Sequence, residues 1–201
     1  MRVVITGFKP SQSHPVNTSW EVKNALSDHV DGIEIIREDM IASYHHSIEY
    51  IDGMIQKYRP DAFICMGQAL RREVISLEKV AINYAYEERD WAVDDDGYLP
   101  KGEAIVPGGP DGLFTNLPIE RMLESIKEQG FPCEISLTAG SIGCNNAMYS
   151  VLYLIHTRYP DLMGGFIHVP GHHEHPRRVR KTFSVQEIAA GVEAALKGLK
   201  G

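Results

Sequence analysis

The sequence contains few cysteines and no long apolar run. Three of its 201 residues are cysteine, Cys65, Cys133 and Cys144, and no two of them form a C-x-x-C pair. An odd and sparse set of this kind excludes a disulfide framework, so we expect reduced thiols and a cytoplasmic protein. No apolar stretch reaches the roughly 18 residues that a membrane-spanning helix needs. The N-terminal MRVVITGF shows none of the features of a signal peptide.

The chain also lacks an excess of positive charge. It carries 20 lysines and arginines against 27 aspartates and glutamates, a formal net charge of -7. No basic stripe is present, which argues against a nucleic-acid partner and against an anionic membrane surface. The basic cluster RRVRK at 177–181 is interpreted as a small solvated patch.

What the sequence does contain is an alternation of apolar, strand-like runs with amphipathic, helical runs. The region 84–118, which is rich in Asp, Gly and Pro, is expected to hold a hairpin or irregular turns. The alternation predicts one α/β domain over residues 1–201, with a largely parallel or mixed sheet that helices cover on both faces. Strands are predicted at 1–8, 32–39, 61–67, 74–83, 133–140 and 164–170, and helices at 43–60, 116–130, 145–159 and 184–199, with another beginning at Thr18 or Ser19.

Three residues at or near the ends of predicted strands could cooperate chemically: Glu78, Cys144 and His168. Cys144 falls where a strand turns into a helix, and unpaired N–H groups there favour a thiolate and stabilise an oxyanion. A buried, inert thiol is the alternative, and Cys65 and Cys133 fit that alternative better. His168 is either a base or a hydrogen-bonded core residue, and Glu78 is costly to bury without a cationic or hydrogen-bonding partner. A thiol, a base and an acid that orients the base form a nucleophilic set.

The remaining motifs give weaker evidence for a functional site. GHHEHP contains His172, His173 and His175, which are too close in sequence to converge easily on a metal. A solvated loop is therefore favoured over a metal site. The acidic turn 94–96 is likewise interpreted as solvated, and TGFKP and GGPDG match no phosphate-binding fingerprint.

Five blocks of residues occur in an order and approximate spacing that resemble one enzyme family. They are TGFKP, PVNTSW, MGQALRREVISLEKVAIN, TAGSIGCNNAMY and GGFIHVP. In this order they resemble pyroglutamyl peptidase type I, also called pyrrolidone-carboxylate peptidase, of the C15 cysteine peptidases. The resemblance extends from Val3 to the last helix. It implies an α/β/α sandwich that removes an N-terminal pyroglutamyl residue from peptides, that needs no metal or cofactor, and that is often a homotetramer.

The resemblance also implies catalytic roles. Cys144 matches the family nucleophile in A-G-x-x-x-C-N, and His168 matches the base in G-F-I-H-x-P. Glu78 matches the acid in E-R-x-A-x-N, where Lys79 replaces the usual arginine and keeps its charge without the planar fork.

The implied substrate pocket departs from the family pattern. Phe8 is kept, and Gln68 matches a position near the substrate amide, but Ser11 stands where an aromatic residue would help to sandwich the lactam ring. Ile142 replaces another residue that is commonly aromatic, and Arg89 is a candidate for the arginine of the family's D-x-R-I-P-D-N segment.

Three functions are compatible with these residues. The leading hypothesis is a cysteine peptidase that removes N-terminal pyroglutamate. The second keeps the same chemistry but accepts another N-acyl or lactam group, because the pocket is altered at Ser11 and Ile142. The third is a non-catalytic binding protein, with the HHEH loop holding a metal.

Overall fold

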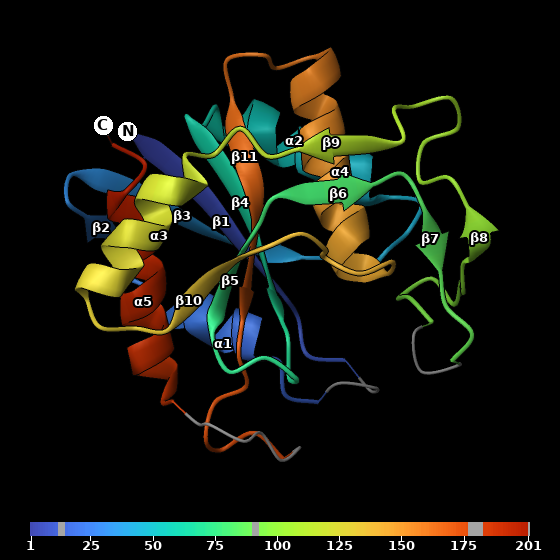
Figure 1. Cartoon of the computed structure of the whole chain (residues 1–201). Coiled ribbons are helices and arrows are strands. Elements are labelled where there is room, and N and C mark those ends of the chain that lie inside the picture. The colour runs from blue at the N-terminus through green and yellow to red at the C-terminus, as the bar shows by residue number, and fades with distance from the viewer. Residues whose placement is uncertain (12–14, 90–92, 177–182, 201) are drawn as a thin grey trace.

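The computed structural model describes residues 1–11, 15–89, 93–176 and 183–200, and these form a central sheet between two layers of helices (Figure 1). The basic cluster at 177–181 lies outside the described residues. The helices are α1 (Thr18–Ala25), α2 (Ser47–Tyr58), α3 (Ile119–Glu128), α4 (Gly143–Thr157) and α5 (Val185–Lys197). The strands are β1 (Arg2–Phe8), β2 (His29–Val30), β3 (Ile33–Met40), β4 (Ala62–Gln68), β5 (Ile75–Glu78), β6 (Val80–Ile82), β7 (Ala85–Tyr86), β8 (Lys101–Glu103), β9 (Gly112–Phe114), β10 (Cys133–Ser136) and β11 (Met163–Val169).

The central sheet has seven strands in the order β10-β5-β11-β4-β1-β3-β2. Parallel pairs join β3 to β1, β1 to β4, β4 to β11, and β5 to β10. Two pairs are antiparallel, β5 with β11 and β2 with β3. The predicted α/β class with a largely parallel or mixed sheet is therefore confirmed.

Apolar residues on both faces of the sheet explain why the central strands are almost continuously hydrophobic. Successive side chains of a strand point to opposite faces, so Val3 and Ile5 of β1 belong to one core and Val4 belongs to the other. The first core is completed by α1, α3 and α5, and the second by α2 and α4. Figure 1 shows α1, α3 and α5 together on one side of the sheet.

The strand predicted at 74–83 is two strands, which corrects the sequence-based expectation. The chain leaves the main sheet at Lys79, whose N–H bonds to the Ser136 carbonyl while its own carbonyl accepts from Thr115 N–H. Beyond Lys79, β6 pairs with β9 in a separate two-stranded sheet. Glu78 therefore ends β5, beside β11.

The region 84–118 contains the expected hairpin, formed by β7 and β8, and an acidic turn that is not simply solvated. The Asp94 carboxylate accepts from Tyr44 N–H at 2.8 Å, and the Asp95 carboxylate accepts from Ala42 N–H at 3.0 Å. These bonds attach the turn to the segment that follows β3. Asp95 and Asp96 are exposed, as expected of a solvated turn, whereas Asp94 is half-buried. In the ranges that the structure describes, no helix has the length and apolar character to cross a bilayer.

Candidate active site

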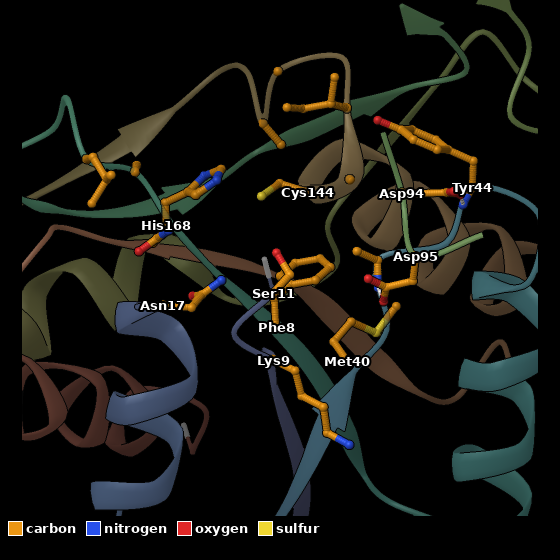
Figure 2. Close-up of a pocket in the computed structure, with 18 of the residues that line it drawn as sticks. Phe8, Lys9, Ser11, Asn17, Met40, Tyr44, Asp94, Asp95, Cys144 and His168 are labelled. Carbon is orange, nitrogen blue, oxygen red and sulfur yellow. Dashed lines mark hydrogen bonds between the residues drawn. The ribbon is translucent and has the colours of Figure 1, made fainter. Parts of the chain in front are cut away.

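The antiparallel pairing of β5 with β11 brings Glu78 and His168 together. Glu78 Oε1 lies 2.7 Å from His168 Nδ1, and both side chains are buried. Cys144 lies in the first turn of α4, which begins at Gly143 rather than at the predicted Asn145. In Figure 2 the sulfur of Cys144 points toward the ring of His168. The structure thus places the three residues singled out from the sequence in one constellation.

The surroundings of His168 favour its protonated form. Burial of the ring lowers its pKa, but the neighbouring Cys144 sulfur and Glu78 carboxylate more than offset this and raise the pKa of His168 to about 9. An imidazolium beside the sulfur, oriented from behind by a carboxylate, is the arrangement that activates a cysteine nucleophile.

Glu78 has the cationic partner that its burial demanded. Arg72 Nη1 lies 2.5 Å from Glu78 Oε1, the same oxygen that faces His168. Burial raises the pKa of Glu78, but the hydrogen bond and charge of His168, followed by hydrogen bonds from Ser136 and Arg72, more than offset this and hold the pKa below its usual value. Sequence reasoning missed Arg72, because Arg71, Arg72 and Lys79 all lie near Glu78 in the sequence and the local pattern does not choose among them.

Gly67 leaves the space that the nucleophile occupies. A Cβ atom at this position would lie 2.7 Å from Cys144 Sγ and 2.8 Å from Cζ of Phe166. Gly67 belongs to β4, so β4 approaches the thiol closely because one of its residues has no side chain.

The two asparagines after Cys144 hold the start of α4 in place. Asn145 bonds through its side chain to both backbone groups of Ile82, at 3.0 and 2.9 Å. Asn146 Nδ2 donates to the Ser43 carbonyl and to Ser47 Oγ, each at 3.0 Å. These bonds anchor the helix that carries the nucleophile to β6 and to the start of α2, roles that the sequence did not reveal.

A cavity of about 640 Å³ opens beside Cys144 and His168. Phe8, Gln68 and Ile142, the residues predicted to bind substrate, all line it, as do Ser11 and Arg89. The amide of Gln68 is engaged with the chain itself, since its oxygen accepts from Thr18 N–H at 3.1 Å and its nitrogen donates to the Val16 carbonyl at 3.5 Å. Its side chain therefore supports the cavity wall.

Asn17 is a cavity residue that sequence reasoning did not single out. Its Oδ1 accepts from both Ser19 N–H and Ser19 Oγ, at 3.1 and 2.7 Å. Its Nδ2 points into the cavity in Figure 2, below Cys144. Because the oxygen is engaged, the group that Asn17 presents to the cavity is a hydrogen-bond donor.

The HHEH loop does not belong to this cavity. His172 and His175 are buried, so the expectation of a solvated loop is wrong for these two side chains. His172 Nε2 lies 2.8 Å from the Glu21 carboxylate of α1. No group of three or more potential ligands is arranged for a metal ion anywhere in the described part of the chain.

A cysteine, an imidazole and a buried carboxylate beside a cavity, on a mixed α/β sheet, define the class of cysteine hydrolases. The model of the pyroglutamyl peptidase family, Peptidase C15, matches residues 1–200. The chain belongs to this family, whose members are thiol peptidases that remove N-terminal pyroglutamate.

Individual members of the family are similar to this protein in sequence and structure along almost the whole chain. A pyrrolidone-carboxylate peptidase of Thermosipho melanesiensis is 38% identical over 99% of this chain and 98% of its own length. The crystal structure of pyroglutamyl peptidase I from Bacillus amyloliquefaciens superimposes with a TM-score of 0.90 at 35% identity, covering 100% of this chain and 95% of that chain. A mutant pyrrolidone carboxyl peptidase from the hyperthermophile Pyrococcus furiosus gives a TM-score of 0.88 at 28% identity, covering 98% of this chain and 97% of that chain. The alternative of a non-catalytic binding protein is therefore abandoned.

Proposed function

We propose that Cys144, His168 and Glu78 carry out the family's reaction, the removal of pyroglutamate from the N-terminus of peptides. The observation that carries this assignment is the contact between Glu78 Oε1 and His168 Nδ1, together with the Cys144 sulfur, which points toward the same ring in Figure 2. Glu78 fixes the proton on Nδ1 and leaves Nε2 for the reaction.

The reaction runs in two steps. In the first, Cys144 Sγ bonds to the carbonyl carbon that follows the lactam ring, the C–N bond breaks, and His168 Nε2 gives its proton to the leaving amine. In the second, water gives a proton to Nε2 while its oxygen bonds to the acyl carbon, and the C–S bond breaks to release pyroglutamate. First-turn N–H groups of α4 stabilise the oxyanion in both steps.

The cavity has features that suit a lactam ring. Phe8, Met40 and Ile142 supply apolar walls, and Asn17 Nδ2 is a donor for the ring carbonyl. Ser11 in place of an aromatic residue removes ring contacts that would be worth about 1–3 kcal/mol if nothing refilled the space.

Because Ser11 replaces an aromatic residue in the cavity wall, substrate preference has to be measured with a panel of related substrates. We expect pyroglutamyl 4-nitroanilide to be cleaved with kcat/KM at least about tenfold above N-acetyl, N-formyl and larger-lactam analogues. The measurement is nitroaniline release across this panel at fixed pH. A preference for one of the analogues would support the alternative of another N-acyl or lactam substrate.

We further propose that residues 1–201 form one catalytic domain that assembles into a homo-oligomer, a tetramer by family resemblance, in the cytoplasm, where a catalytic thiol stays reduced. Ile82, Tyr84, Tyr86 and Phe114 are exposed large apolar side chains of the β6–β9 and β7–β8 region, and they supply a surface for assembly.

The oligomer prediction is tested by solution mass. Light scattering of the purified chain is expected to give four chain masses. Phe114→Ser, which removes a ring that is 69% exposed, is expected to lower this mass. A monomeric wild-type chain would contradict the prediction.

A further inference from the structure

Arg72 joins two separate parts of the active site. It lies in the turn between β4 and β5, where its N–H bonds to the Ala69 carbonyl at 2.9 Å. Its Nη1 donates to Glu78 Oε1 at 2.5 Å, and its Nη2 donates to the Thr138 carbonyl at 2.9 Å. Thr138 belongs to the segment between β10 and α4, which leads directly to Cys144. The guanidinium of Arg72 therefore bonds both to Glu78 and to the segment that leads to Cys144.

The charges around Glu78 change during the reaction. Before acylation the imidazolium of His168 faces Glu78. After acylation the sulfur is part of a thioester, and His168 has given its proton to the leaving amine. Glu78, with no exposed surface, then remains an anion beside a neutral ring. In the described part of the chain, Arg72 is the cation that still bonds to it.

An isolated buried carboxylate takes up a proton in preference to staying charged. A protonated Glu78 would donate to His168 Nδ1, and the ring proton would then be on Nε2. In that tautomer Nε2 cannot accept a proton from water. The second step would therefore lose its base, whereas the first step, which uses the imidazolium, would be affected less.

We propose that Arg72 is a positioning residue that keeps Glu78 ionised in the acyl-enzyme and so holds His168 in the tautomer that activates water. This inference rests on the proposed catalytic function and adds a role that is specific to its second step. This bridging geometry suits arginine, because one planar guanidinium donates to the Glu78 carboxylate and to the Thr138 carbonyl at the same time.

Other charged groups near Glu78 are engaged elsewhere. Lys79 lies 3.7 Å from the Glu120 carboxylate, and Glu134 on β10 accepts from Ser76 Oγ at 2.8 Å. In the described ranges, the groups that act on the Glu78–His168 pair are Arg72 from the β4–β5 turn, the uncharged Ser136 of β10 and Cys144 from α4, and Arg72 is the cation among them. Removal of Arg72 takes away one positive charge and raises the apparent pKa of this coupled pair.

The test separates the two steps with two substrates. The kcat for a pyroglutamyl 4-nitrophenyl ester, with its good leaving group, reports the second step, and kcat/KM for the 4-nitroanilide reports the first. Arg72→Met is expected to lower the ester kcat by roughly 10²-fold and the anilide kcat/KM by clearly less. The acid limb of the ester kcat profile is expected to move upward by about one pH unit.

Two further variants supply controls. Arg72→Lys keeps the charge, so its acid limb should stay at the wild-type pH even though the bond to Thr138 weakens. Arg71→Met removes the same charge from the neighbouring, exposed residue and should leave the limb unmoved. Equal losses on both substrates, an unmoved limb in Arg72→Met, or the same shift in Arg71→Met would overturn the inference. An inactive wild type would instead refute the proposed function.

Discussion

Cys144→Ala is expected to abolish hydrolysis of pyroglutamyl 4-nitroanilide, with kcat lowered by roughly 10⁴-fold or more. The reason is that the first step forms a bond to Cys144 Sγ, and alanine offers no group that can attack the carbonyl. Because alanine keeps the helical backbone and Cys144 is partly exposed, the fold should survive. The measurement is nitroaniline release under conditions in which wild type turns over many times.

A matched control is Cys133→Ala, which removes another partly exposed thiol. Cys133 lies at the start of β10, and its Sγ donates weakly to the Leu123 carbonyl at 3.5 Å. Full activity is expected for this variant. Its loss, or turnover by Cys144→Ala at the wild-type rate, would show that another group is the nucleophile.

The position of the nucleophile could be predicted because its causes are local. Small residues after a strand and an apolar helical run after Cys144 are enough to place the thiol at a helix start. The structure moves that start by two residues, from Asn145 to Gly143, which puts Cys144 inside the first turn. Helix ends are set by small differences in local bonding, so boundaries are the least predictable part.

The partners of the nucleophile depended on long-range pairing that no local pattern encodes. A run from 74 to 83 resembles one strand, yet the chain turns off the sheet at Lys79. The antiparallel placement of β5 against β11 then sets Glu78 opposite Phe166, close to His168. The need for a partner to Glu78 was predictable from desolvation, whereas the identity of Arg72 was not. The buried His172 is a similar case, because its neighbour Glu21 lies far away in the sequence.

Glu78→Gln is expected to lower kcat by roughly 10²- to 10⁴-fold while leaving the shape of the site intact. The amide oxygen can still accept from His168 Nδ1 and Arg72 Nη1, but the negative charge is lost. That charge helps to raise the pKa of His168 to about 9, so the pKa should fall in the variant. The first step needs the imidazolium, and the alkaline limb of kcat/KM should therefore move to lower pH.

The control for this prediction is Glu134→Gln, which removes a carboxylate from the neighbouring strand β10. Glu134 is exposed and accepts from Ser76, the residue paired with it across the two strands. Its loss changes the overall charge by the same amount but removes no bond to His168, so both the rate and the alkaline limb should remain those of the wild type. If Glu78→Gln lowers the rate but leaves the alkaline limb of kcat/KM in place, the carboxylate only positions the ring. If both variants move the alkaline limb equally, the shift reflects the overall charge of the protein, and Glu78 has no specific part in holding the proton on His168.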